Sequence, residues 1–143
     1  QPDSTYQLIL DKGTFTDFYY QSNDSLGTEF QVQTLEYYGK LLINIPDTLH
    51  QPLLLQLWDK DEKNLFRQLF FKPNKEAPQA VMELVDPGEY KLKIVLDKNE
   101  NKQWDSGDLY KRKQPEKVYY HPELFKVRSN WDLEINLEFN KML

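Results

Sequence analysis

The chain has 143 residues, of which 39% are hydrophobic and 14% aromatic, enough to bury the core of one domain, or of one domain and part of another. Its formal net charge of -5 disfavours a nucleic-acid-binding protein, which needs a basic face to meet the phosphate backbone. The sequence contains no cysteine, which excludes disulfides, thiolate metal sites and cysteine nucleophiles. No apolar run is long enough for this segment to insert into a membrane as a helix.

The first 36 residues predict a β-hairpin. Residues 6–10 and 29–35 have the composition of strands. Between them, residues 11–28 are rich in Gly, Ser, Asn and Asp, which is typical of a long loop. We expect residues 5–10 and 29–35 to pair as strands without completing a second sandwich of their own.

The central part of the chain predicts short strands separated by polar turns, and its helix signals are weak. The strands are expected at residues 40–45, 53–58, 66–72, 80–85 and 124–128. Many short strands of this kind favour an all-β, antiparallel β-sandwich, which we place at residues 37–143 with the hairpin as its N-terminal extension.

Residues 86–89 predict a turn before one of the clearest strands. Pro87 pre-sets the backbone of the second turn residue, and Gly88 accepts a positive φ at the third, as a type II turn requires. From Tyr90 to Leu96 apolar residues alternate with polar ones, the period of a strand that buries one face.

The twelve residues from Asp97 to Asp108 have the spacing of a calcium-binding loop. Side-chain oxygens stand at the first, third, fifth, ninth and twelfth positions, and Ca²⁺ takes about six to eight oxygen ligands. Trp104 is expected to turn inward as the hydrophobic anchor of the loop. A bound Ca²⁺ would have a structural role, fixing the connection between two strands. The candidate ligands are Asp97, Asn99, Asn101, Asp105 and Asp108 through their side chains and Gln103 through its carbonyl.

A metal-free loop is the competing interpretation, and no cofactor is required. Lys102 occupies the sixth position, where a sharp turn favours glycine, and Asp108 the twelfth, where a longer Glu normally binds through both oxygens. In that case Asx-type turns and backbone hydrogen bonds hold the loop. The basic run at residues 111–113 is expected to be a solvated strand end that offsets the charge of the acidic loop.

The end of the chain predicts another strand with one buried face. Apolar and polar residues alternate strictly there. Trp58 ends an apolar strand and lies on the same strand face as Leu54. Core packing is therefore expected to explain at least two of the three tryptophans. The core-facing residues of the last strand are expected to be Trp131, Leu133, Ile135, Leu137 and Phe139.

Nothing in the sequence predicts a catalytic site. The two histidines, His50 and His121, each lie beside a proline-containing turn, and no Gly-x-Ser-x-Gly nucleophile turn occurs. A pair of carboxylates of the glycosidase type depends on spacing in three dimensions and is a general possibility in acidic proteins. We therefore expect turn histidines and a protein that is not an enzyme.

Residues 37–143 carry a family resemblance. The run Pro87-Gly88-Glu89-Tyr90-Lys91-Leu92 resembles the Pro-Gly-x-Tyr-x-Leu signature of prealbumin-like and collagen-adhesin B-type sandwiches of bacterial surface proteins. With residues 97–107, 114–120 and 127–132 in this order, the region resembles the C-terminal part of Bacteroidetes cell-surface lipoproteins that carry bacterial Ig-like domains. Residues 5–17 and 29–34 are similar to the last two strands of such an Ig-like domain.

The resemblance implies a location and a domain organisation. It implies an extracytoplasmic protein of the cell envelope or surface, with residues 1–36 as the end of a preceding Ig-like domain and residues 37–143 as an Ig-like or prealbumin-like sandwich. Since the chain starts at Gln1 without an initiator methionine or a signal peptide, we expect a mature product or an excised fragment.

The expected function is that of a non-enzymatic structural or binding module in a larger cell-envelope protein. Its expected partners are the adjoining Ig-like domain of the same protein and a glycan or surface protein. The alternative is a carbohydrate-binding module, in which exposed Tyr and Trp side chains, such as the pair Tyr19-Tyr20, stack on sugar rings.

Overall fold

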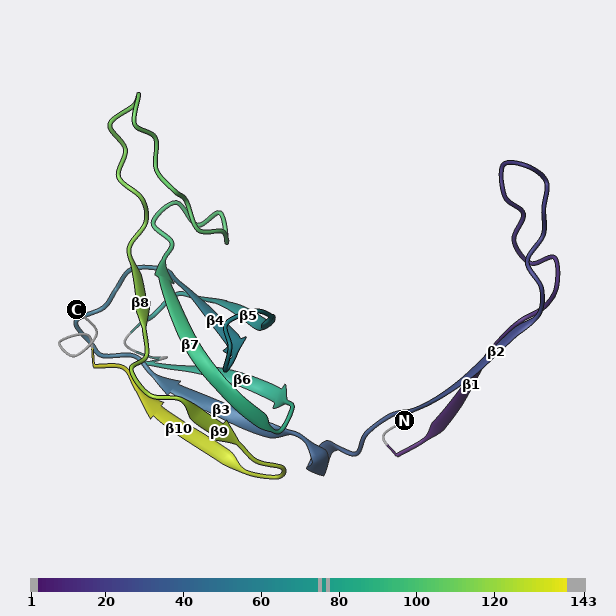
Figure 1. The fold of residues 1–143 in the computed structure, drawn as a ribbon. Helices are drawn as coiled ribbons and strands as arrows, with labels where there is room; N and C mark the ends of the chain where they lie inside the picture. The colour runs from purple at the N-terminus through teal and green to yellow at the C-terminus, as the bar shows by residue number, and fades with distance from the viewer. Residues whose placement is uncertain (1–2, 75, 77, 139–143) are drawn as a thin grey trace. The chain divides into compact units, whose positions relative to one another are not determined.

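The structure is all-β in both parts of the chain. Figure 1 shows the computed structural model, which describes residues 3–74, 76 and 78–138. The chain divides into two units, residues 1–35 and 36–143. Among the described residues, the one helical segment is the short 3-10 helix η1 (Leu35–Tyr37). The predicted all-β class is therefore confirmed.

The first unit is an antiparallel hairpin of β1 (Thr5–Leu10) and β2 (Leu26–Gln31). The second strand begins and ends earlier than the predicted residues 29–35. The register explains this difference, because it places Tyr6 opposite Phe30 and Leu10 opposite Leu26. Pairing in this register places Tyr6, Leu8, Leu10, Leu26 and Phe30 on one face of the hairpin, with Ile9 on the other.

The second unit is a sandwich of two sheets. One sheet has the strand order β10 (Asp132–Asn136), β3 (Gly39–Asn44), β6 (Gln79–Val85). The other has the order β5 (Leu65–Phe71), β4 (Leu53–Asp59), β7 (Gly88–Leu96), β8 (Val118–Tyr120), and β9 (Phe125–Val127) also pairs with β7. The predicted sandwich is confirmed, and the Ig-like or prealbumin-like type stays a prediction.

One strand pair departs from the predicted antiparallel arrangement. β10 runs parallel to β3, whereas the other pairs are antiparallel. The chain leaves β9 in the five-stranded sheet and crosses at residues 128–131 to the other sheet, where β10 enters in the direction of β3. The alternation of apolar residues predicts which face of a strand is buried and carries no information on strand direction.

The core lies between the two sheets. It follows the period of two along each strand, so that successive inward residues such as Leu53, Leu55 and Leu57 of β4 are fully buried. On the opposite face of the same sheet, Leu54 and Val95 are also fully buried. The five-stranded sheet is therefore covered on its outer side as well.

The turn before β7 differs from the predicted type II turn. Gly88 does not have a positive φ; in this part of the chain Leu84 does, at φ 54°. Gly88 instead begins β7, where a Cβ atom would lie 3.1 Å from the Tyr90 hydroxyl oxygen. That hydroxyl donates a hydrogen bond of 2.9 Å to the Asp86 carbonyl. In the Pro-Gly-x-Tyr run, the glycine therefore leaves room for Tyr90 to pack beneath the turn.

The start of β10 also corrects a prediction. Trp131 is 60% exposed, although Ile135 and Leu137 on the same predicted face are buried and Leu133 is half-buried. β10 begins only at Asp132, so Trp131 belongs to the preceding turn, where Asn130 has a positive φ of 50°. Trp58 is half-buried, and Phe139 lies outside the described residues. Core packing therefore does not explain Trp131.

Candidate functional site

The connection between β7 and β8 carries the site predicted from the sequence. Figure 1 shows this connection extending well beyond the two strands that it joins. Its first residues are fixed to their neighbours: the Asp97 N–H donates to the Pro52 carbonyl at 3.1 Å, and the Gln68 side-chain amide donates to the Lys102 carbonyl at 3.1 Å. Gln68 belongs to β5, so residues 97–102 lie against the five-stranded sheet.

Asp97 is the buried end of the loop. Its side chain is fully buried, and its two carboxylate oxygens accept the backbone N–H groups of Asn101 at 3.1 Å and Lys102 at 2.8 Å. Both Glu100 and Lys102 have positive φ, 60° and 62°. The sharp turn expected at Lys102 is therefore present without a glycine, and the Asp97 carboxylate holds it.

Two further predicted residues, Asn99 and Asn101, meet at Asp105. Its carboxylate accepts the side-chain amide of Asn99 at 2.5 Å and that of Asn101 at 3.3 Å. The hydrogen bond from Asn99 lowers the pKa of Asp105 against the opposing effect of burial, and Asn101 and Lys113 lower it further. The structure thus brings together four of the six predicted ligands: Asp97, Asn99, Asn101 and Asp105.

The other two predicted ligands take part in turns. The Gln103 N–H donates to the Asn101 side-chain oxygen at 2.9 Å, an Asx-type turn. Asp108 accepts the N–H groups of Tyr110 at 3.0 Å and Lys111 at 3.1 Å, and the Lys111 ammonium lies 3.3 Å from its second oxygen. The backbone N–H of Lys111 is the main cause that lowers the pKa of Asp108. Asp108 therefore caps the turn at the far end of the connection.

The basic run pairs with the acidic loop, but it lies in a turn of the β7–β8 connection and not at the predicted strand end. In addition to the ion pair between Lys111 and Asp108, the Lys113 ammonium lies 3.4 Å from a carboxylate oxygen of Asp105. Both lysine side chains are exposed, so solvent screens these pairs and their contribution to stability is small.

Glu116 is a further residue that holds the loop, and the sequence did not predict it. It is buried, and its carboxylate accepts the N–H of Lys98 at 3.0 Å and that of Asp105 at 3.2 Å. Its own carbonyl accepts the indole N–H of Trp104 at 3.1 Å. Trp104 is 47% exposed, so it does not turn inward as predicted. Glu116 thus ties the two ends of the loop together. The one feature of the sequence that points to Glu116 is that it is the single acidic residue between Asp108 and β8.

The hydrogen bonds of this loop are those of the metal-free interpretation. Asn99 and Asn101 direct their amide nitrogens at Asp105, while their side-chain oxygens accept backbone N–H groups at 3.2 and 2.9 Å. A Ca²⁺ ion would have to displace these bonds, because it takes oxygen ligands. Over the described residues, no group of three or more His, Asp or Glu side chains is arranged to hold a metal ion.

Calcium binding by the loop stays a prediction. Its test is thermal unfolding with Ca²⁺ and with a chelator, because an ion that binds the folded state alone raises the melting temperature. The Asp97→Ala variant should abolish any such shift.

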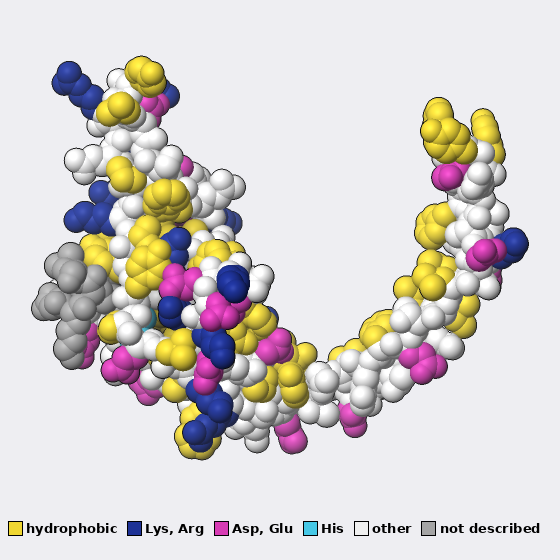
Figure 2. Space-filling view, viewed as in Figure 1, with side chains coloured by type: hydrophobic (Ala, Val, Ile, Leu, Met, Phe, Trp, Pro, Cys, Tyr) yellow, Lys and Arg dark blue, Asp and Glu magenta, His cyan; other side chains and the backbone are white. Residues whose placement is uncertain are grey.

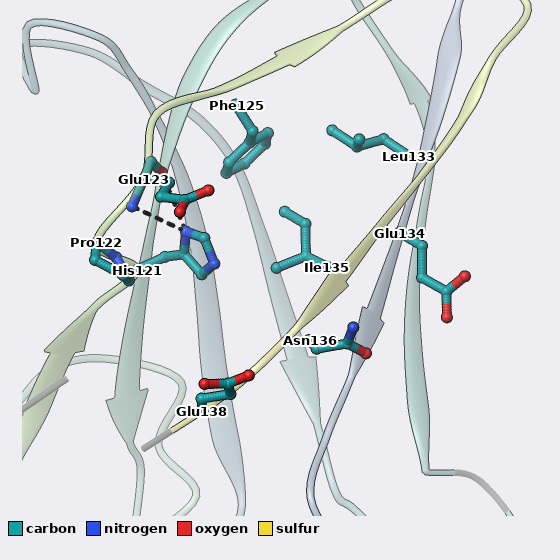
Figure 3. Close-up of a pocket in the computed structure, with 9 residues that line it drawn as sticks. All are labelled: His121, Pro122, Glu123, Phe125, Leu133, Glu134, Ile135, Asn136 and Glu138. Atoms are coloured by element: carbon teal, nitrogen blue, oxygen red, sulfur yellow. Dashed lines mark hydrogen bonds between the residues drawn. The ribbon is translucent and has the colours of Figure 1, made fainter. Parts of the chain in front are cut away.

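A second concave site lies on the side of the sandwich where β10 and the turn between β8 and β9 face each other (Figure 3). It has a volume of about 340 Å³, with Phe125 and Ile135 among its apolar residues. The His121 ring nitrogen Nδ1 lies 3.3 Å from the N–H and 3.1 Å from the carbonyl of Glu123. His121 is therefore a turn residue, as predicted.

Exposed aromatic side chains gather at the tip of the hairpin in the first unit. One carboxylate oxygen of Asp17 accepts the N–H groups of Tyr19 at 2.8 Å and Gln21 at 2.9 Å, which holds the tip in a tight turn. Phe18 and Tyr20 are each 91% exposed. Figure 2 shows apolar side chains at the surface along this hairpin and at its tip.

Comparisons of the chain with protein-family models, with curated proteins and with solved structures found no match. The resemblance to Bacteroidetes lipoproteins with Ig-like domains therefore stays a prediction. No helix in the described ranges is long and apolar enough to cross a membrane.

Proposed function

We propose that the chain is a non-enzymatic structural or binding module of a larger cell-envelope protein. The observation that carries this proposal is the apolar face of the hairpin in the first unit. Tyr6 and Phe30 stack on this face with their ring centres 5.7 Å apart, and Leu8 and Leu26 lie on the same face. All four side chains are exposed in this structure.

A two-stranded hairpin with an open apolar face is marginally stable in water by itself. Contiguous apolar surface of this kind is typical of a face that another structure covers. We infer that an adjoining Ig-like domain of the same protein covers the hairpin. The sandwich, whose described core residues all lie within residues 41–137, would follow that domain as a separate module.

The loop supports a structural role for the second unit. The side chains with the chemistry of a site, Asp97, Asp105 and Glu116, all accept backbone N–H groups or side-chain amides of the loop itself. Carboxylates used in this way stabilise a connection. The cell-envelope location in the proposal rests on the sequence resemblance.

Hydrogen exchange in a longer version of the protein, which includes the sequence before Gln1, tests the proposal. The amides of β1 and β2 should exchange more slowly in the longer protein than in residues 1–143, because the apolar face is then covered. Phe30→Ser should remove this protection, whereas Gln7→Ser on the opposite face should preserve it. Equal exchange in both proteins would contradict the proposal, as would a hydrolytic activity that one carboxylate substitution abolishes.

A carbohydrate-binding module is the second candidate, and the hairpin tip favours it. Phe18, Tyr19 and Tyr20 form an exposed aromatic cluster on a turn that Asp17 fixes, and aromatic faces stack on the apolar faces of sugars. A glycan array tests this function. Binding that Tyr19→Ala with Tyr20→Ala abolishes and that Gln31→Ala preserves would favour it over the structural role.

A further inference from the structure

A further cavity, of about 290 Å³, lies at the end of the sandwich from which the connection between β7 and β8 departs. The turn between β3 and β4 forms one wall of this end cavity, and the end of β7 and the start of β8 form the other. Backbone hydrogen bonds join these segments: the Asp97 N–H donates to the Pro52 carbonyl at 3.1 Å, and the Leu96 N–H donates to the Lys117 carbonyl at 2.9 Å. The walls are therefore in place before a ligand binds, which lowers the cost of binding.

Two lysines line the end cavity from the same face of the five-stranded sheet. β7 pairs with β8 so that Ile94 lies opposite Tyr119, and the bond from the Leu96 N–H to the Lys117 carbonyl continues this register. Residues opposite each other share a face, and successive side chains of a strand alternate between faces. Lys117 therefore projects on the same side as Leu96, and Lys98, two residues after Leu96, lines the same cavity.

The positive charge of the end cavity is not neutralised by the protein. No Asp or Glu is among its described lining residues. Lys98 and Lys117 are both exposed, and neither belongs to an ion pair in the described part of the chain. The carboxylates next to them in sequence, Asp97 and Glu116, accept backbone N–H groups instead. Because like charges on one face of a sheet repel each other, an anion bound between the two lysines would be stabilised.

The other residues of the end cavity supply hydrogen-bond donors and an apolar surface. Thr48 and Gln51 are exposed and line the cavity, and a hydroxyl and a side-chain amide can both donate to anionic oxygens. Leu49 and Tyr119 are half-buried and pack against the core, so that part of each side chain stays accessible in the cavity that they line. A few polar groups that converge beside apolar side chains are typical of a site for a small molecule.

We propose that the end cavity binds a small phosphate monoester. At pH 7 a phosphate monoester carries a charge of about -1.5 to -2 and three acceptor oxygens, which match the two ammonium groups of Lys98 and Lys117 and the hydroxyl of Thr48. The carbon skeleton of the ester lies against Leu49 and Tyr119. This inference goes beyond the proposed function, and its test is independent, because the end cavity belongs to the second unit and the apolar hairpin face to the first.

Titration of the full chain with phenyl phosphate, followed through amide chemical shifts, tests the proposal. Phenyl sulfate and phenol are the controls, because they carry the same ring with a single charge and with no charge. We expect saturable binding of phenyl phosphate with a Kd at or below about 1 mM, with shifts at residues 48–51, 96–98 and 117–119. Phenyl sulfate should bind about tenfold more weakly, and phenol should not bind.

Three outcomes of this titration would overturn the proposal: no saturation by phenyl phosphate, shifts confined to other parts of the chain, or equal affinity for phenyl sulfate. Inorganic phosphate, which lacks the carbon skeleton, should bind more weakly than phenyl phosphate. Equal affinity for inorganic phosphate would overturn the role of Leu49 and Tyr119 and the assignment to an organic ester.

Two pairs of lysine substitutions locate the site. Lys98→Gln with Lys117→Gln should weaken the binding of phenyl phosphate about tenfold or more, and the fold should persist because both side chains are exposed. Lys111→Gln with Lys113→Gln is the matched control: it changes the net charge equally within the same connection and should bind as the parent protein does. Unchanged affinity of the first variant, or an equal loss of affinity in both, would overturn the proposal.

Discussion

Single carboxylates organise the loops of this protein. Asp97 and Glu116 are buried and accept backbone N–H groups from both ends of the same loop. Asp17, Asp59 and Asp108 do the same at exposed turns. A carboxylate that satisfies two N–H groups determines the path of a turn more strongly than turn propensity does. The acidic composition therefore reflects how the connections are built.

Asp97→Ala should destabilise the protein by about 2 kcal/mol, because it leaves the N–H groups of Asn101 and Lys102 without their buried acceptor. Urea unfolding measures the effect. Asp61→Ala, at an exposed turn position, is the control and should remain within about 0.5 kcal/mol of the parent protein. Equal stability of Asp97→Ala and Asp61→Ala would show that the loop does not depend on this carboxylate.

The lowered pKa values of Asp105 and Asp108 predict a loss of stability in acid. A carboxyl group whose pKa is lower in the folded state stabilises the fold above its ordinary pKa of 3.8, and this contribution disappears as the pH falls through the lowered value. Unfolding free energy measured from neutral pH to below pH 3.8 should therefore fall more steeply for the parent protein than for Asp105→Asn. If the unfolding free energies of the two proteins fell in parallel with pH, the lowered pKa of Asp105 would be contradicted.

At the scale of strands, the sequence predicted where most strands lie and missed how some of them pair. The period of two is a local property, and it located β4, β6 and β7 to within two residues. β8 was missed because its three residues are too short to show a period. The parallel direction of β10 and the exposure of Trp131 depend on where the chain crosses between sheets, which no local pattern encodes.

The candidate sites show the same contrast between local patterns, which the sequence reveals, and contacts between distant residues, which it does not. The spacing of residues 97–105 predicted a convergent cluster because all its members belong to one short loop. Glu116 was not predicted because it lies outside the twelve-residue spacing, 18 residues after Lys98. The concave site beside β10 was not predicted because the turn after β8, β9 and β10 line it together. Which strands flank such a cavity follows only from the order of strands in the sheets.

Gly39→Ala should destabilise the sandwich by about 1–3 kcal/mol through overpacking. A Cβ atom at Gly39, the first residue of β3, would overlap the Val127 side chain of β9 and lie 2.6 Å from the Arg128 carbonyl. Gly27→Ala is the matched control, since nothing lies within 4 Å of its added Cβ. Thermal unfolding compares the two variants. Similar melting temperatures would mean that β3 and β9 can move apart at Gly39 without loss of stability.

At the scale of the whole chain, the two units differ in how they are held together. The core of the sandwich belongs entirely to the second unit, whereas the hairpin of the first exposes its apolar face. The buried core and the exposed apolar face therefore lie in different parts of the chain. This division is consistent with the proposed function, in which the sandwich folds by itself.

Residues 36–143 produced alone should fold and should match the sandwich of the full chain in stability to within about 0.5 kcal/mol, because effects of distant, independent parts are additive. Denaturant unfolding followed by tryptophan fluorescence is a direct measurement, since all three tryptophans lie in this unit. A much lower midpoint for the shorter protein would show that the hairpin supports the sandwich.

The parallel pairing of β3 with β10 has a mechanical consequence. Among the described strands of the second unit, β3 is the first and β10 the last, and they lie side by side in the same direction. Tension between the start of β3 and the end of β10 therefore acts along the strands, and the hydrogen bonds of the ladder bear the force together in shear. An antiparallel pair would break one bond after another. The module is thus built to resist being stretched from its two ends.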